Sequence, residues 1–160
     1  MGEDYSTKGP LCVDLDGTLI KTDLLWESLL ALLKQSPLSL FLLPFWLLKG
    51  KAHFKHEIAR RVTLDASTLP YHEDLIAFLT EQRRSGRTLV LATASHVNFA
   101  QAVDRHLGLF EGQVFGSDAS INLKGARKVA LLVERFGTRG FAYAGNSTRS
   151  EERRVGKECL

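Results

Sequence analysis

Two aspartates stand two residues apart directly after an apolar run, in the segment LCVDLDGTL (11–19). The run has the composition of a short buried strand, and Gly17 permits a sharp turn after it. Because side chains alternate along an extended chain, we expect Asp14 and Asp16 to point to the same side. Two carboxylates held this close repel each other unless a cation lies between them, and Mg²⁺ prefers such oxygen ligands. One carboxylate could then attack a phosphorus atom while the other moves the proton of the leaving group.

The apolar residues along the chain predict the elements that position this pair. Runs dense in β-forming residues predict buried strands, and apolar residues at helical spacing predict helices. Strands are expected near 11–14, 88–95, 112–118 and 140–145, and helices near 23–34, 37–48, 52–62, 72–85, 97–107 and 124–136. From residue 88 onward strands and helices alternate, which favours a parallel sheet with its functional crevice at the carboxyl ends of the strands. The long helical stretch between the first two strands is large enough to form a cap.

The segment DLDGTL (14–19) resembles the first motif of the haloacid dehalogenase-like (HAD) superfamily, which is dominated by Mg²⁺-dependent phosphatases. The resemblance runs from about Leu11 to Ser147 and is greatest to the phosphoserine-phosphatase-like branch, where a helical cap follows the first motif. It implies an α/β fold with a Rossmann-like parallel sheet and a helical cap inserted after the first strand. The implied domain spans 1–148, with the core at about 8–20 and 85–148 and the cap at about 21–84.

The second motif of this superfamily is a Thr or Ser that ends the second strand, and Thr93 in LVLATAS (89–95) matches it. The resemblance implies that the Thr93 hydroxyl and the backbone N–H groups of the following turn hold phosphate oxygens. Ser95 is close enough to assist. The phosphate-binding residues expected around the catalytic ones are therefore Gly17, Thr18, Ala94 and Ser95.

The third motif is a lysine, which offsets the negative charge of the phosphate and the aspartate in the transition state. The segment NLKGARK (122–128) offers two candidates. Lys124 stands before a glycine at the expected start of a helix, as in the phosphoserine-phosphatase-like branch, and is the preferred catalytic lysine. Lys128 lies one helical turn further on and is expected to be a solvated residue.

The fourth motif supplies acidic metal ligands, usually an Asp directly after a Gly and a second Asp four residues later. Here Gly145 is followed by Asn146, and residue 150 is Ser. An Asn carbonyl can bind Mg²⁺ but contributes no negative charge. The resemblance therefore implies Mg²⁺ as the cofactor and Asp14, Asp16 and Asn146 as its protein ligands.

The end of the chain departs from the pattern that precedes it. RSEERRVGKEC (149–159) has no apolar periodicity and resembles the translation of a sequencing adapter. We expect residues 149–160 to be a non-native tail and the native protein to continue beyond Thr148. Domains of this type, with AGNS in the fourth motif, often precede a membrane-embedded, UbiA-type prenyltransferase. The resemblance thus implies a prenyltransferase domain in the same native chain.

The segment PLSLFLLPFWLL (37–48) is almost wholly apolar and lies between Lys34 and Lys49. It is shorter than the ~20 residues that cross a bilayer, and Pro44 interrupts it. The favoured interpretation is a pair of helices buried against its own domain. The alternative is a surface that touches a membrane or a membrane-embedded partner.

Composition narrows the remaining possibilities. The 160 residues make up a single domain with a net charge of +3, and the basic residues are scattered without interleaved aromatics, so a nucleic-acid partner is not expected. Two cysteines form no disulfide framework, which favours the cytoplasm, or the inner face of the membrane if a prenyltransferase domain is attached. His53 and His56 are expected to be a surface pair. His96 is expected either to contact substrate or to cap the next helix.

These features favour a Mg²⁺-dependent phosphomonoester hydrolase that acts through an aspartyl-phosphate intermediate. Asp14 is the expected nucleophile, Asp16 the acid and base, and Thr93 and Lys124 hold the phosphoryl group. The expected substrate is a phosphorylated small molecule or a polyprenyl-linked phosphate. The alternative is a non-catalytic regulatory or docking domain attached to a membrane polyprenyl prenyltransferase.

Overall fold

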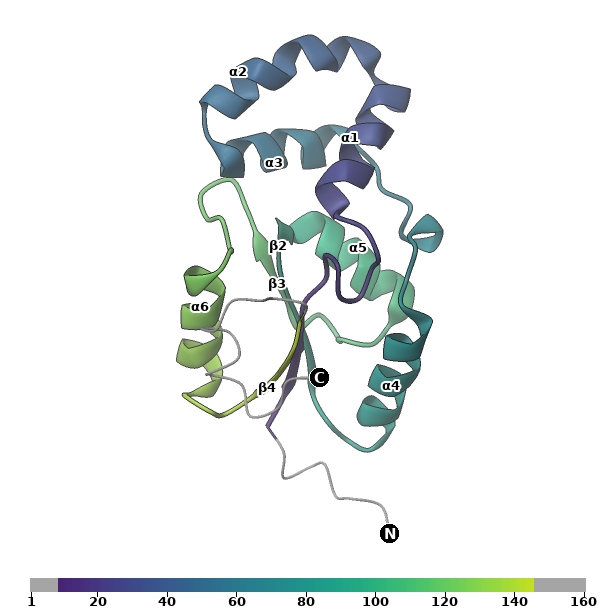
Figure 1. Ribbon diagram of the computed structural model, residues 1–160, viewed down its shortest axis with the longest axis vertical. Helices are drawn as coiled ribbons and strands as arrows, with labels where there is room; N and C mark the ends of the chain where they lie inside the picture. The colour runs from purple at the N-terminus through teal and green to yellow at the C-terminus, as the bar shows by residue number, and fades with distance from the viewer. Residues whose placement is uncertain (1–8, 146–160) are drawn as a thin grey trace.

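The computed structural model describes residues 9–145, and it consists of an α/β core with a helical cap above it (Figure 1). The core sheet is parallel throughout, and its strand order is β3-β2-β1-β4. Its strands are β1 (Leu11–Val13), β2 (Leu89–His96), β3 (Val114–Ser117) and β4 (Ala142–Ala144). The predicted Rossmann-like parallel sheet is confirmed. Asn146 and the tail at 149–160 lie outside the described residues.

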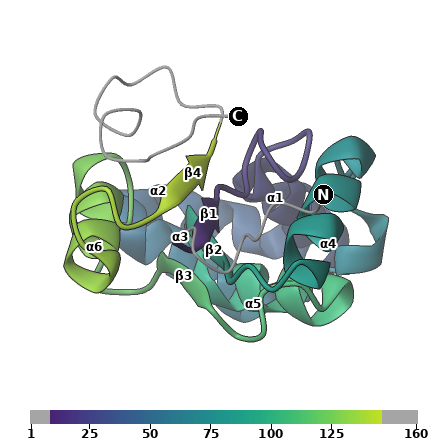
Figure 2. The same cartoon turned by 90° about the horizontal axis from the view of Figure 1, so that it is seen from below.

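Helices cover both faces of the sheet. Successive side chains of a strand point to opposite faces, so each strand contributes to two apolar clusters. Leu11 and Val13 of β1 pack into the apolar cluster that contains Leu79 and Phe99, while Cys12 between them packs with Leu132 on the other face. The helices α4 (Glu73–Arg84) and α5 (Val97–Leu107) cover the first face, and α6 (Ala126–Phe136) covers the second. Figure 2 shows the sheet between them. The core is therefore a three-layer structure.

The helices begin and end where the sequence carries capping residues. The side chain of His96 caps α5 by accepting a hydrogen bond from the backbone N–H of Asn98. Gly108 ends α5 in the left-handed conformation, with φ of 65°, which glycine adopts without steric cost. Asp23 caps the first cap helix through the N–H of Leu25. The helix-capping alternative for His96 is confirmed.

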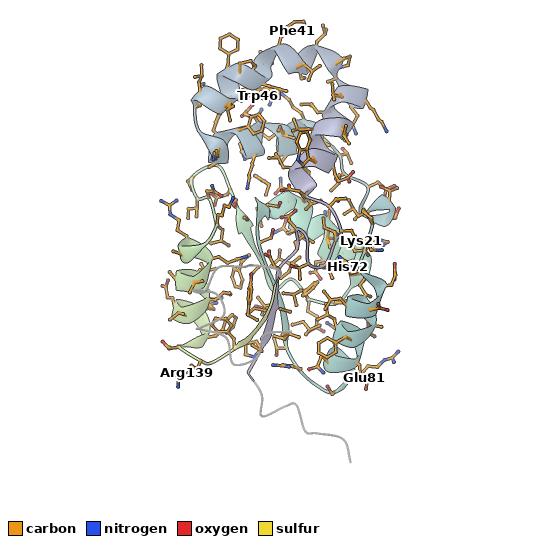
Figure 3. The ribbon with its side chains drawn as sticks, viewed as in Figure 1. Lys21, Phe41, Trp46, His72, Glu81 and Arg139 are labelled. Carbon is orange, nitrogen blue, oxygen red and sulfur yellow. The ribbon has the colours of Figure 1, made fainter. Side chains whose placement is uncertain are left out.

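The cap is built from four consecutive helical segments, which have an apolar cluster of their own. They are α1 (Leu24–Gln35), η2 (Pro37–Leu42), α2 (Leu43–Leu48) and α3 (Lys51–Arg61). Leu32, Trp46, Ile58 and Val62 are buried together between them. Figure 3 shows Trp46 directed toward α3, and the guanidinium of Arg61 lies over its ring, 4.5 Å from the ring centroid.

The cap is shorter than the sequence predicted. The predicted boundary of 21–84 included α4, but Leu79 of α4 is fully buried in the cluster that covers the sheet. Ala66 of the short helix η3 (Ala66–Thr68) and Leu69 belong to the same cluster. An amphipathic pattern predicts that a helix buries one face, but it does not indicate which element covers that face. The cap therefore ends with α3, and α4 belongs to the core.

The two segments that connect the core with the cap, at residues 19–21 and 70–72, lie side by side. The backbone N–H of Lys21 donates to the carbonyl of Pro70 at 2.8 Å, and that of His72 donates to the carbonyl of Leu19 at 3.0 Å. Figure 3 shows Lys21 and His72 together at this boundary. These bonds pair the chain segment that enters the cap with the segment that returns from the cap to α4.

The apolar segment 37–48 is not buried as predicted. Trp46 is 7% exposed, but Phe41 is 75% and Leu48 is 85% exposed. Figure 3 shows Phe41 at the outer edge of the cap. The two helical segments are short and present a wide apolar surface, of which the cap cluster covers only one side. Within residues 9–145 no helix is both long and apolar enough to cross a bilayer.

Candidate active site

A pocket of about 470 Å³ lies between the carboxyl ends of the strands and the cap, where open parallel sheets bind ligands. The core contributes acidic and polar groups, and the cap contributes apolar side chains and lysines. Its lining residues are Asp14, Asp16, Asp23, Leu25, Leu47, Lys51, Phe54, Lys55, Ala94, Ser95, Asn122 and Lys124. Five of the residues predicted from the sequence, Asp14, Asp16, Ala94, Ser95 and Lys124, therefore meet in one place.

Asp14 is fixed at the end of β1 by three contacts. Its backbone N–H donates to the carbonyl of Ala144 in β4 at 2.9 Å, and its Oδ1 accepts the N–H of Leu15 at 2.9 Å. Its Oδ2 lies 3.1 Å from the Nζ of Lys128. Burial raises the pKa of Asp14, and the neighbouring ammonium of Lys128 opposes that rise. The carboxylate is thus partly desolvated and stays paired with a cation, which suits a nucleophile.

Lys128 is not the solvated residue that the sequence predicted. Its side chain is 5% exposed, and its Nζ also lies 5.3 Å from the ring centroid of Tyr143 in β4. The side chain leaves the first turn of α6, and the packing of α6 on the sheet directs it toward β1 and β4. Lys124 is exposed and lines the pocket, so its predicted catalytic role stays a prediction.

Asp16 accepts three hydrogen bonds, which come from two elements, β2 and α1. Its Oδ2 accepts the hydroxyl of Thr93 at 3.0 Å and that of Ser95 at 2.7 Å. Its Oδ1 accepts the backbone N–H of Leu24, at the start of α1, at 2.7 Å. The carboxylate thus joins the loop after β1, the end of β2 and the first cap helix.

Thr93 is fully buried, and its hydroxyl both donates and accepts a hydrogen bond within the protein. It donates to Asp16 and accepts the backbone N–H of Ser95 at 3.0 Å. Thr93 does not line the pocket, whereas Ser95 does. The predicted contact between Thr93 and a phosphate oxygen stays a prediction. In the structure this hydroxyl orients Asp16.

Gly17 and Thr18 form the turn after β1 and do not line the pocket. Gly17 has a φ of 70°, which favours glycine, and its N–H donates to the carbonyl of Thr22 at 3.3 Å. The N–H of Thr18 donates to the carbonyl of Leu15 at 3.3 Å. Their predicted role in substrate binding stays a prediction. The turn returns the chain so that Asp16 meets the start of α1.

The cap adds cations that the sequence interpretation did not identify. Lys55 of α3 donates from Nζ to the carbonyl of Ala94 at 2.7 Å, and Lys51 lines the same pocket. Burial lowers the pKa of Lys55, and the charges of Asp16 and Asp23 oppose that shift. A lysine on an amphipathic helix is usually a solvated residue, so the sequence carries no signal that separates Lys55 from its neighbours.

His56 is not part of a simple surface pair with His53, as the sequence had suggested. Its Nδ1 lies 3.0 Å from the Nε2 of His96, which is 4% exposed at the end of β2. Burial and the neighbouring His56 both lower the pKa of His96. This contact joins α3 of the cap to the core next to the pocket. The forty-residue separation of the two histidines hides it from any local pattern.

Asp14 and Asp16 offer carboxylate oxygens to one pocket, which matches the ligand preference of Mg²⁺. Among residues 9–145 no group of three or more His, Cys, Asp or Glu side chains is placed to hold a metal ion. The two aspartates alone fit a partial site. The third predicted ligand, Asn146, lies outside the described residues.

No protein-family model matches the chain. The chain is 40% identical over 144 residues to the uncharacterized protein y4nM of Sinorhizobium fredii (strain NBRC 101917 / NGR234). The match covers 89% of this chain and 27% of that relative, so the chain spans little more than a quarter of the relative's length.

Solved structures with a similar fold are HAD-type hydrolases. A phosphoserine phosphohydrolase-like protein from Francisella tularensis subsp. tularensis SCHU S4 has a TM-score of 0.53 at 12% identity, covering 95% of this chain and 94% of its own. The HAD family hydrolase t0658 from Salmonella enterica subsp. enterica serovar Typhi has a TM-score of 0.60 at 14% identity, covering 92% and 61%. The L-2-haloacid dehalogenase RSc1362 has a TM-score of 0.50 at 14% identity, covering 86% and 77%. At these identities the likeness concerns the fold, and it establishes the predicted HAD-like architecture.

Proposed function

We propose that the chain is a Mg²⁺-dependent phosphomonoester hydrolase that forms an aspartyl-phosphate on Asp14. The observation that carries the proposal is the meeting of Asp14, Asp16 and the Asp14–Lys128 ion pair at the carboxyl end of the sheet. A nucleophilic carboxylate, a second carboxylate for proton transfer and a buried cation are the groups that phosphoryl transfer needs.

In the proposed reaction an oxygen of Asp14 attacks the phosphorus atom and the ester oxygen departs. Asp16 gives its proton to that leaving oxygen, and then takes a proton from the water that attacks the same phosphorus. This second attack releases phosphate and restores the Asp14 carboxylate. Asp16 suits both steps because the hydroxyls of Thr93 and Ser95 hold Oδ2 in one orientation.

The lysines around the pocket would offset the charge of the phosphoryl group. Lys128 pairs with the nucleophile itself, and Lys124, Lys51 and Lys55 line the space where a phosphate would lie. Asp14 and Asp16, together with Asn146, would hold Mg²⁺, which supplies further positive charge to the phosphate oxygens when it is bound.

The pocket suggests a class of substrate. Leu25, Leu47 and Phe54 of the cap helices give the pocket an apolar wall beside its two aspartates. A phosphomonoester with an apolar leaving group would place its phosphate on the charged side and its organic part on that wall. A phosphorylated small molecule and a polyprenyl-linked phosphate both belong to this class.

The proposal has two further parts. The enzyme acts in the cytoplasm, and its native chain also carries a membrane prenyltransferase domain. The cytoplasmic location rests on the composition, because a chain with two cysteines has no disulfide framework. The prenyltransferase domain, which would place the enzyme at the inner face of the membrane, rests on the sequence resemblance. A purely non-catalytic docking role is less favoured, because docking would not require a buried lysine on the aspartate at the sheet edge.

The experiment is a phosphate-release assay of the full chain on a panel that includes p-nitrophenyl phosphate, sugar phosphates and a prenyl monophosphate. Wild-type turnover with Mg²⁺ should be lost with a chelator and fall by more than about 10³-fold in Asp14→Asn, which keeps the shape of the side chain. No Mg²⁺-dependent turnover on any substrate, or equal turnover by Asp14→Asn, would refute the proposal.

A further inference from the structure

The outermost part of the cap is an exposed apolar surface, which we call the cap tip. It is formed by η2 and α2, which lie farthest from the sheet (Figure 1). Exposed fractions reach 78% for Leu38, 75% for Phe41, 64% for Phe45 and 85% for Leu48. Leu40 and Leu42 complete the surface. Single exposed apolar residues are common, but a contiguous set of this kind marks an interaction site.

The fold of the cap does not require these side chains. Trp46, Leu32, Ile58 and Val62 form the cap cluster, and none of the six exposed residues that make up the cap tip takes part in it. Phe41 and Trp46 illustrate the division, because Phe41 lies at the outer edge while Trp46 points toward α3 (Figure 3). The cap tip therefore has a role other than holding the cap together.

The charged residues next to the cap tip in the sequence have a single sign. Lys34, Lys49 and Lys51 flank it and are exposed, and the sequence contains no Asp or Glu from residue 28 to residue 56. An apolar surface with aromatic residues and a border of lysines is complementary to a bilayer with anionic headgroups, because the rings enter the acyl boundary and the lysines meet the phosphates.

We propose that the cap tip docks on the surface of a bilayer that contains anionic lipid. A protein partner fits less well, because lysine is depleted at protein–protein interfaces whereas it is the residue that anionic headgroups attract. The apolar segment is also shorter than the ~20 residues that a spanning helix needs, so its place is the interface rather than the bilayer centre. This inference rests on the surface and does not depend on the hydrolase proposal.

Docking would bring the active-site pocket close to the lipid. Leu47 lines the pocket and is also 54% exposed, directly before Leu48 of the cap tip. An apolar path therefore connects the pocket wall with the surface that would enter the bilayer.

The experiment is flotation of the full chain with vesicles of phosphatidylcholine and phosphatidylglycerol in equal amounts, and with phosphatidylcholine alone. Three variants are compared with the wild type: Phe41→Asp combined with Phe45→Asp, Lys49→Glu, and Arg84→Glu. Arg84 is the matched charge control, because it lies at the end of α4 in the core and its side chain is 76% exposed. Thermal unfolding is followed for each variant to verify folding.

The wild type should bind the mixed vesicles and bind less in high salt or on phosphatidylcholine alone. The double phenylalanine variant should bind at least about tenfold more weakly, Lys49→Glu about fivefold or more, and Arg84→Glu like the wild type. If the double variant does not fold, the comparison of vesicle binding by Lys49→Glu and by Arg84→Glu tests the proposal.

Failure of the wild type to bind the mixed vesicles would overturn the proposal, as would wild-type binding by a folded double variant or by Lys49→Glu. Self-association of the wild type in sedimentation velocity that the double variant abolishes would assign the cap tip to a second copy of the chain and also overturn it.

Discussion

The Nζ of Lys128 lies 3.1 Å from the Oδ2 of Asp14, and the two side chains are 5% and 17% exposed. A pair this well shielded from water interacts more strongly than an exposed salt bridge, and removing one partner leaves the other charge without compensation. The pair joins the first turn of α6 to the end of β1. It therefore links the packing of the core directly to the chemistry of the pocket.

Replacing Lys128 should impair the proposed reaction more than replacing Lys124. Lys128→Met should lower kcat/KM by about 10²–10³-fold, because it removes the cation that pairs with the nucleophile, while Lys124→Met should lose much less. Steady-state kinetics of the two variants on the best substrate of the panel measures the difference. A larger loss for Lys124→Met would return the catalytic role to that residue.

The same pair should contribute a coupling free energy to stability. Lys128→Met leaves Asp14 buried and unpaired, and should reduce the free energy of unfolding by about 3–5 kcal/mol at neutral pH. Adding Asp14→Asn should restore much of that loss, because no charge then remains uncompensated. Denaturant unfolding of the two single variants and the double variant measures the coupling. Additive single and double effects would contradict the ion pair.

Thr93 should act through the orientation of Asp16. Thr93→Ser keeps the hydroxyl that donates to Oδ2 of Asp16, so its kcat should stay close to that of the wild type, whereas Thr93→Val should lose about 10²-fold in kcat. Because Thr93 is fully buried, Thr93→Val should also lose about 1–3 kcal/mol of stability from the unmet hydrogen bonds. Kinetics and denaturant unfolding of both variants are the measurement. Equal kinetics of Thr93→Ser and Thr93→Val would exclude this role.

His96 should make stability fall in mildly acidic solution. Burial and His56 lower its pKa in the folded protein, whereas an unfolded histidine titrates near about 6.5. Below that pH the unfolded chain binds a proton that the folded chain does not, so the free energy of unfolding falls as the pH falls toward the folded-state pKa of His96.

His96→Asn isolates this contribution, because Asn keeps a side-chain acceptor for the N–H of Asn98 but does not titrate. Unfolding free energies of this variant and the wild type between about pH 5 and 8 are compared, a range in which an unperturbed histidine titrates. The wild type should lose more stability than the variant on the acidic side. Parallel curves would contradict the account of His96.

Two aromatic residues of the cap should differ sharply in their contribution to stability. Trp46→Ala should cost about 3–5 kcal/mol because Trp46 is buried in the cap cluster, while Phe41→Ala at the exposed edge should change stability by less than about 0.5 kcal/mol. Thermal or denaturant unfolding of both variants is the measurement. A large loss in Phe41→Ala would mean that the cap tip is part of the folded core.

The order of the elements could be predicted from the sequence because local patterns determine it. The apolar runs that became β1 and β2 are buried strands, and Asp23 and Gly108 mark a helix start and a helix end through their own backbone and side-chain preferences. Asp14 and Asp16 were identified for the same reason, because they follow a strand that must end at the sheet edge.

The remaining part of the site depends on packing between distant elements. Lys128 reaches Asp14 because of the way α6 lies on the sheet. Lys55 reaches the pocket, and His56 reaches His96, because α3 lies above the end of β2. The exposure of the cap tip has the same origin, since hydrophobicity alone does not state which partner covers a residue. No local pattern contains these relationships.

The most direct measurement of the central claim is the site of covalent phosphorylation. The full chain is mixed with a phosphomonoester and Mg²⁺, quenched in acid during turnover, digested and examined by mass spectrometry, with Asp14→Asn treated in parallel. A phosphoryl group on Asp14 in the wild type that is absent from Asp14→Asn is the predicted result. Turnover without any phosphoryl group on Asp14, or with one on another residue, would contradict the account.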